Sequence, residues 1–129
     1  MIFRTVHYWL CCTGFNTDQF LAELGGIDAR VELAPRPTKR FGPYDYVFID
    51  ASDVDRPIDT LLEQLLDKLE PARAILAKWG DRVTSGVAVE VRTNNSRYSE
   101  AVSPEVLRRL AELNLEVSFC CEHASPESN

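Results

Sequence analysis

The sequence predicts a single α+β domain, with helices on one face of a mostly antiparallel sheet of about five strands. A leucine-rich stripe in residues 57–69 recurs at the three- and four-residue spacing of an amphipathic helix. On both sides of this helix, segments rich in β-branched and aromatic residues alternate as strands do. The expected order is strand, helix, strand, strand, helix, strand, helix, strand. The first six elements form a ferredoxin-like β-α-β-β-α-β core, and a C-terminal α-β unit completes it.

The first strand is expected at residues 3–12. Its better core face carries Val6, Tyr8, Leu10 and Cys12, and its opposite face carries Thr5, His7, Trp9 and Cys11. A short helix at residues 17–24 follows. Asn16 is its expected N-cap, and Gly25 is the residue that ends it.

Residues 29–33 predict a short second strand. The following loop, residues 34–43, contains three prolines and a glycine, which exclude regular structure. This loop also holds a basic cluster in an acidic chain, formed by Arg36, Lys39 and Arg40. Two interpretations stay open, because the cluster either contacts an anionic ligand or partner or belongs to a solvated loop.

A third strand is expected at residues 44–51, with aspartates at its end and beyond it: Asp50, Asp53, Asp55 and Asp59. Their spacing lacks the turning glycine and the bidentate glutamate of a calcium loop, so we interpret them as capping and dipole-stabilising groups. Pro57 suits the first helical position. Pro71 predicts a break near Glu70, followed by a second helical piece that ends at Trp79.

The remaining elements are a long strand at residues 83–93, a helix at residues 104–113 capped by Ser103, and a strand at residues 115–121. The last helix is expected to turn Val106, Leu107, Leu110 and Leu113 inward, and the last strand to present Leu115, Val117, Phe119 and Cys121 to the core. Residues 1–123 are therefore one domain, and residues 124–129 predict a flexible tail.

The composition is typical of a soluble globular protein, with 129 residues, 45% hydrophobic and 26% charged. The formal net charge of −6 argues against binding to nucleic acid, whose phosphates require a basic surface. The first residues form a stretch too short and too polar for a signal peptide or a membrane span. We therefore expect a cytoplasmic protein with neither nucleic acid nor membrane among its partners.

The residues that carry chemistry form no complete catalytic motif. The sequence contains no glycine-rich phosphate loop, no serine between glycines and no paired-histidine zinc motif. The cysteine pairs Cys11-Cys12 and Cys120-Cys121 lack the spacing of a zinc knuckle or a redox motif. A thiol–imidazole pair with His7 or His123 is opposed by topology, since the first and last strands should run in opposite directions. The sequence thus assigns no catalytic residue, no metal ligand and no cofactor.

Several segments show a family resemblance. They are residues 65–71 (LLDKLEP), residues 103–105 (SPE) and residues 107–113 (LRRLAEL), with Phe20-Leu21, Leu24-Gly25, and Pro37-Thr38 followed by Lys39, Arg40 and Gly42 upstream. In these segments the chain resembles an uncharacterised bacterial family, domain of unknown function 4279 (DUF4279). The resemblance implies a fold and no catalytic residues. Small acidic domains of this kind include immunity proteins that neutralise a toxin, which is an analogy of size and charge.

The sheet face opposite the leucine-rich helix should combine aromatic and charged side chains. By strand alternation it carries His7, Trp9, Tyr46, Phe48, Glu90 and Arg92, with Glu116, Ser118 and Cys120 beside them. An apolar patch with a polar rim marks a binding surface. We expect a cytosolic, non-enzymatic protein-interaction module that binds another protein or itself as a homodimer, with an immunity-like role as one option. Three alternatives stay open: the chain's own loops cover this sheet face, the protein is a small-molecule-binding domain, or it is a thiol- or metal-dependent enzyme.

Overall fold

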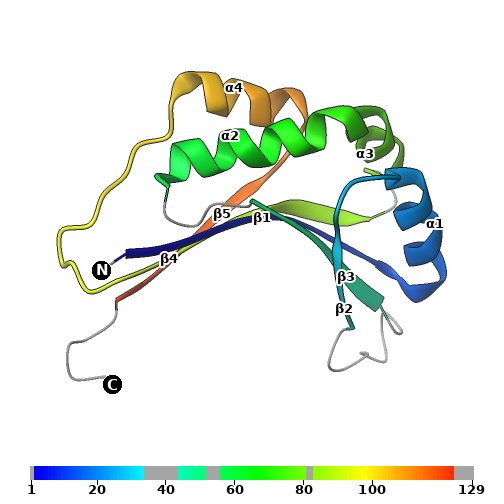
Figure 1. The fold of residues 1–129 in the computed structure, drawn as a ribbon, viewed down its shortest axis with the longest axis horizontal. Helices are drawn as coiled ribbons and strands as arrows, with labels where there is room; N and C mark the ends of the chain where they lie inside the picture. Colours follow the sequence, from blue (N-terminus) through cyan, green and yellow to red (C-terminus); the bar gives the residue numbers. More distant parts are fainter. Residues whose placement is uncertain (1, 34–43, 52–55, 81–82, 124–129) are drawn as a thin grey trace.

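The computed structural model describes residues 2–33, 44–51, 56–80 and 83–123, without the side chains of residues 12–17, 31–33 and 44–46. Within these residues, one sheet carries all the helices on a single face (Figure 1). In chain order the elements are β1 (Ile2–Thr13), α1 (Gly14–Leu24), β2 (Arg30–Leu33), β3 (Tyr44–Asp50), α2 (Ile58–Leu69), the 3-10 helix η1 (Glu70–Ala72), α3 (Arg73–Trp79), β4 (Thr84–Thr93), α4 (Pro104–Glu112) and β5 (Val117–His123). The α+β class predicted from the sequence is confirmed.

The five strands of the described residues lie in the order β2-β3-β1-β4-β5. β3 lies between β1 and β2 and is antiparallel to both. β4 pairs antiparallel with the other side of β1, and β5 pairs parallel with β4. β1 is therefore the central strand of a mixed sheet, and β5 forms one of its edges.

The core lies between α2 and the helix-facing side of the sheet. The stripe of α2 is buried throughout and comprises Ile58, Leu61, Leu62, Leu65, Leu66 and Leu69. Below it the central strands bury Val6, Tyr8, Leu10, Val47, Ile49, Val87 and Val89. Burial of one such side chain contributes about 1.5–3 kcal/mol. The helix-facing side of the sheet thus supplies most of the apolar stabilisation.

The helix ends follow the signals in the sequence. Pro71 falls in the 3-10 turn between α2 and α3, because it has no N–H to donate and its ring crowds the preceding turn. Gly25 and Asn114 adopt the left-handed conformation after α1 and α4, with φ of 67° and 54°. Ser103 caps α4 by accepting the Val106 N–H at 3.3 Å.

Three predicted boundaries are wrong by a few residues. α1 begins at Gly14 rather than at residue 17, and the side chain of the expected cap Asn16 is not described. Pro57 is the N-cap of α2 rather than its first helical residue. β5 begins at Val117 rather than at Leu115, and it continues to His123. Such ends depend on local hydrogen bonding that periodicity does not report.

The burial predicted along β5 and α4 is wrong at three residues. Phe119 and Cys121 lie in register with the core residues Val89 and Val91, yet Phe119 is 62% exposed and Cys121 is exposed as well. Leu107 is 54% exposed instead of buried. The helix near this edge, α4, packs against α2 and buries only Val106 and Leu110 of its own residues. Alternation fixes the direction of a side chain, but it does not say whether another element covers it.

Polar contacts tie the start of α2 to β1 and to the segment before α4. Arg4 donates from Nε to Glu100 Oε2 at 2.7 Å, and the Tyr98 hydroxyl donates to the same oxygen. Glu100 Oε1 accepts the N–H of Ile58 at 3.1 Å. Asp59 Oδ1 accepts the N–H of Ser103 at 2.7 Å. One end of the helix layer is therefore held to the sheet by hydrogen bonds as well as by apolar packing.

Candidate functional site

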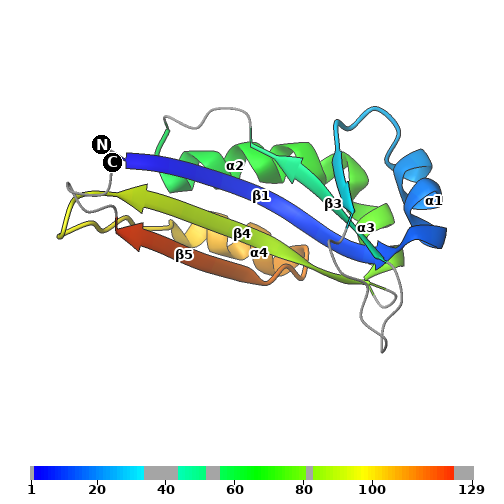
Figure 2. The same ribbon diagram turned by 90° about the horizontal axis from the view of Figure 1, so that it is seen from below.

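The sheet face that points away from the helices is called the open face below. In the view from beneath, the strands lie in front of the helices, and no helix crosses this face in the described part of the chain (Figure 2). Strand register assigns to it Phe3, Thr5, His7, Trp9 and Cys11 of β1, Arg30 of β2, Phe48 and Asp50 of β3, Gly86, Ala88, Glu90 and Arg92 of β4, and Ser118, Cys120 and Glu122 of β5.

One row of the open face runs across four strands. The register pairs Arg30 with Phe48, Phe48 with Trp9, and Trp9 with Gly86. The guanidinium carbon of Arg30 lies 4.5 Å from the centroid of the Phe48 ring, a cation–π contact. Trp9 and Phe48 are both half-buried, so neighbouring residues support each ring while part of it stays accessible to solvent.

Gly86 gives the Trp9 indole its place on the sheet. A Cβ at Gly86 would lie 3.2 Å from Trp9 Nε1 and 3.2 Å from the carbonyl oxygen of Glu116. Both distances are shorter than an ordinary carbon contact, so the indole lies against the backbone of β4 where only glycine leaves room. The glycine in a strand otherwise rich in valine therefore positions Trp9.

His7 and Asp50 face each other in the next row. The rings of His7 and Phe48 meet edge to face, with centroids 5.1 Å apart and planes at 88°. Arg30 donates from Nε to Asp50 Oδ2 at 3.4 Å. The guanidinium charge of Arg30 and the carboxylate charge of Asp50 therefore compensate each other beside the rings. His7, Trp9 and Phe48 thus form an aromatic cluster that is bordered by an ion pair.

The half of the open face nearer β5 is polar. Thr5 Oγ1 donates to Glu90 Oε2 at 3.3 Å, and Arg92 donates from Nη2 to Glu122 Oε2 at 3.1 Å. A hollow of about 360 Å³ lies here, lined by Phe3, Thr5, Glu90, Val91, Arg92, Cys120 and Glu122. Phe3 is 51% exposed and adds apolar surface among these paired charges.

The predicted binding surface is thus divided into two parts. The three residues His7, Trp9 and Phe48 lie together, as the register and ring contacts show. Glu90 and Arg92 share the face, but their partners on β1 lie four and six residues from Trp9, which is about 13 and 20 Å along the strand. His7 is closer to the polar part, since it lies two residues, or about 7 Å along the strand, from Thr5, the partner of Glu90.

Two other predictions concern residues that the structure describes only in part or not at all. Tyr46 pairs with Cys11 in the strand register, which is the alternation expected for the open face, but its side chain is not described. The basic loop of Arg36, Lys39 and Arg40 lies outside the described residues.

The sequence reasoning missed several residues of the open face, among them Phe3, Arg30, Asp50, Gly86 and Glu122. Phe3 has the same alternation as Trp9 on β1, so the signal was present. Arg30 and Asp50 join the aromatic cluster only through the register of β2, β3 and β1, which no single strand encodes. Glu122 lies beyond the predicted end of the last strand.

The strand register separates His7 from the cysteines whose side chains the structure describes, Cys11, Cys120 and Cys121. His7 and Cys11 are four residues apart on β1, which is about 13 Å and beyond hydrogen-bond reach. Cys11 pairs with Thr84 at one end of β4, whereas Cys120 pairs with Glu90 toward the other end. Cys120 and Cys121 are exposed and are not joined in a disulfide.

The described residues contain no group of three or more His, Cys, Asp or Glu side chains that is placed to hold a metal ion. Among the same residues, the helices are all too short or too polar to cross a lipid bilayer.

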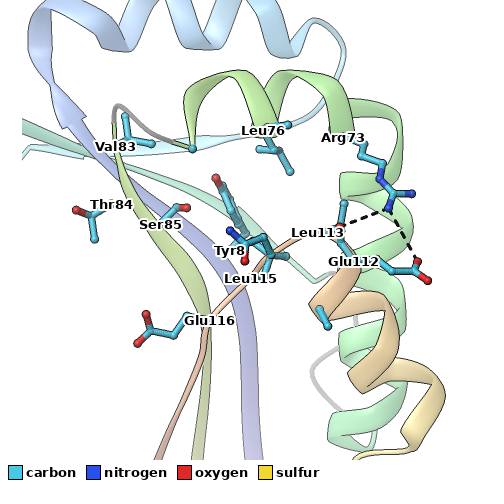
Figure 3. Close-up of a pocket in the computed structure, with 14 residues that line it drawn as sticks. Tyr8, Arg73, Leu76, Val83, Thr84, Ser85, Glu112, Leu113, Leu115 and Glu116 are labelled. Atoms are coloured by element: carbon cyan, nitrogen blue, oxygen red, sulfur yellow. Dashed lines mark hydrogen bonds and ion pairs between the residues drawn. The ribbon is translucent and has the colours of Figure 1, made fainter.

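A larger hollow of about 810 Å³ lies on the helix-facing side, between the end of α3 and the turn from α4 to β5 (Figure 3). Tyr8, Leu76, Leu113 and Leu115 supply apolar surface to it. Its described lining contains no His, Cys or Lys, and its polar side chains include the hydroxyls of Thr84 and Ser85 and the carboxylate of Glu116. The volume is in the range of ligand-binding pockets.

The rim of this hollow is shared by acidic and basic groups. Arg73 donates from Nη2 to the carbonyl oxygen of Glu112 at 3.4 Å and lies 4.0 Å from the Glu112 carboxylate (Figure 3). Arg108 also donates to that carboxylate. A hydrogen bond to Glu105, followed by the charges of Glu105 and Glu112, raises the pKa of Arg108 above its ordinary value. Glu112 is thus compensated by two arginines.

Comparison with known proteins adds no relative: no family model matches this chain, and no curated protein or solved structure is significantly similar to it.

Proposed function

We propose that this protein is a non-enzymatic interaction module that binds a basic protein partner through the open face. The observation that carries the proposal is the pair Trp9 and Phe48, half-exposed side by side on a sheet face that no helix covers in the described residues. Partly exposed aromatic side chains near the centre of a surface are the residues that dominate binding energy at protein interfaces.

The charge of the face supports a basic partner. Arg30 is paired with Asp50, and Arg92 is paired with Glu122, so both arginines of the face are compensated. Glu90 adds a further carboxylate, and the chain as a whole carries a net charge of −6. A Lys or Arg of the partner would lie over the Trp9 ring, and a second one would reach Glu90. An immunity-like role, in which an acidic domain neutralises a basic toxin in the cytoplasm, is consistent with this charge.

The proposal includes the finer description of the fold. The order β2-β3-β1-β4 with three antiparallel pairs supports a ferredoxin-like core for the first six elements. Membership of DUF4279 remains part of the proposal, and it rests on the helix and cap segments quoted above.

The test is an affinity capture from the native host with three immobilised forms of the chain: wild type, the double variant Trp9→Ala/Phe48→Ala, and Leu107→Ala. Leu107 is a matched control, because it is 54% exposed and apolar but lies on α4. A captured protein is then purified and titrated against each form. We expect a basic protein that binds the wild type and Leu107→Ala equally and binds the double variant about 100-fold more weakly.

Circular dichroism of the double variant checks that its helices persist. A purified partner that binds the folded double variant as tightly as the wild type would contradict the use of the open face. A partner of acidic composition would contradict the charge argument.

A second candidate function, small-molecule binding, is favoured by the hollow between α3 and the α4–β5 turn. Replacing Ala111 with Trp would fill this hollow from an exposed position. A small molecule that co-purifies with the wild type and the open-face double variant, but not with Ala111→Trp, would assign the function to the hollow instead. Native mass spectrometry distinguishes these outcomes.

A further inference from the structure

The outer side of β5 has no strand partner among the described residues. β5 is the last strand in the sheet order and pairs only with β4. Every residue of β5 from Ser118 to His123 is exposed, and Val117 is half-buried. An edge strand with an unpaired row of N–H and C=O groups is a template for pairing with another strand.

The hydrogen bonding to β4 shows which backbone groups of β5 point outward. The N–H of Val87 donates to the carbonyl oxygen of Glu116 at 2.7 Å, so the backbone of Glu116 points toward β4. Backbone direction alternates along a strand, and the groups of Ser118, Cys120 and Glu122 therefore also point toward β4. The outward N–H and C=O groups belong to Val117, Phe119, Cys121 and His123.

The side chains of β5 lack the features by which proteins usually protect an edge. The strand contains no Pro and no Lys, and its one carboxylate, Glu122, is paired with Arg92 of the neighbouring strand. Phe119 is 62% exposed on one side of the sheet. On the other side, Phe3 is 51% exposed in the hollow that Cys120 also lines. Exposed apolar surface is therefore present on the strand itself at Phe119, and a second exposed aromatic ring, Phe3, lies two strands away on β1.

We infer that β5 pairs antiparallel with β5 of a second copy of this chain, about a two-fold axis that passes through Cys120. This register pairs all seven residues of the strand and keeps each side chain on its own face. Across the axis, Phe119 meets Cys121, Ser118 meets Glu122, and Val117 meets His123. No two like charges face each other, which makes the strand complementary to itself.

The pairing joins two sheets into one continuous sheet with both helix layers on the same side. The two open faces then lie next to each other, so the inference goes beyond the proposed function and does not compete with it. Because the groups of Cys120 point toward β4, the two Cys120 residues form a non-hydrogen-bonded pair with Cα atoms about 4.5 Å apart. The two Cys121 residues are each opposite Phe119 of the other copy, so their Cα atoms are about 9 Å apart.

The experiment is disulfide trapping of the full chain. One variant keeps only Cys120 (Cys11→Ser, Cys12→Ser, Cys121→Ser), and its matched control keeps only Cys121 (Cys11→Ser, Cys12→Ser, Cys120→Ser). Diamide oxidises two thiols to a disulfide by accepting their two electrons and two protons. We expect a covalent dimer for the Cys120 form at a yield at least tenfold above that of the Cys121 form, because Cα atoms more than about 7 Å apart cannot be bridged without backbone movement.

A second measurement does not depend on thiol chemistry. Light scattering under reducing conditions at about 100 μM should give twice the monomer mass of 14.6 kDa for the wild type. Cys121→Pro removes an outward N–H but no bond to β4, so it should weaken dimerisation at least tenfold and leave the circular dichroism spectrum unchanged. The double variant Trp9→Ala/Phe48→Ala should dimerise as the wild type does, which separates this inference from the proposed function.

A wild-type mass of 14.6 kDa together with no Cys120 cross-link would overturn the inference. Equal cross-linking of the Cys120 and Cys121 forms would overturn the register. If the chain's own C-terminal residues cover the edge instead of a second copy, the protein will be a monomer without a Cys120 cross-link, and the inference is overturned.

Discussion

Arg4 and Glu100 form an ion pair beneath the first turn of α2, with Arg4 Nε 2.7 Å from Glu100 Oε2 and side chains that are only 15% and 14% exposed. Oε1 of the same carboxylate accepts the N–H of Ile58, whereas the N-cap residue Pro57 offers no side-chain hydrogen bond. Glu100 therefore serves as the cap of a helix that begins 42 residues earlier.

Replacing Glu100 with Ala should destabilise the fold by about 2 kcal/mol, because it removes a helix cap and leaves the partly buried Arg4 without its carboxylate. Glu105→Ala is the control, since Glu105 pairs with Arg108 in an exposed position and should matter much less. Urea unfolding gives both free energies. Equal losses in the two variants would contradict the capping role of Glu100.

Replacing Gly86 with Ala should displace the Trp9 indole and lower the free energy of unfolding by about 1 kcal/mol, since the new Cβ would approach Nε1 at 3.2 Å. Nuclear magnetic resonance should show a shift of the Trp9 indole N–H signal and none of the Trp79 signal. Gly26→Ala is the control, because a Cβ there meets no atom within 4 Å. An unmoved Trp9 signal in Gly86→Ala would rule out the close contact.

Substitution by glycine usually lowers the stability of a protein, but at Asn114 we expect it to keep or raise the stability. The residue has a φ of 54°, which an L side chain tolerates poorly and glycine adopts freely. Asn114→Gly should therefore keep or raise the stability, while Asn114→Ala should lower it by about 1 kcal/mol. Thermal unfolding monitored by circular dichroism ranks the three proteins. An alanine variant as stable as the glycine variant would refute the left-handed assignment.

The two sides of the sheet should respond differently to truncation. Leu65→Ala removes a fully buried side chain of α2 and should cost about 2–5 kcal/mol. Phe48→Ala removes a larger but half-buried ring from the open face and should cost about 1 kcal/mol. Chemical unfolding of both variants provides the comparison. A larger loss for Phe48→Ala would mean that the aromatic cluster serves the fold rather than binding.

The elements predicted from the sequence are those with a strong local signal. The leucine stripe of α2, the break at Pro71, the cap at Ser103 and the left-handed Asn114 each follow from residues that are close in the chain. The alternation of β1 also placed His7 and Trp9 on the face away from the helices. Periodicity and capping chemistry act over a few residues, so a single sequence is sufficient to read them.

The missed features depend on residues that are distant in the chain. The contact of Arg30 with Phe48 requires the register of β2 and β3, and the capping of α2 by Glu100 links two segments across the fold. The exposure of Phe119 depends on how far α4 extends over an edge strand. The local sequence pattern predicts neither the strand register nor which side chains another element covers, because both depend on how whole elements pack together.

Placement of every described helix on a single side of the sheet has an evolutionary consequence. Substitutions on the bare side, at positions such as Trp9 or Glu90, remove little of the apolar packing on which folding depends. A lineage can therefore change the chemistry of this side one residue at a time, while the leucines of α2 keep each intermediate folded.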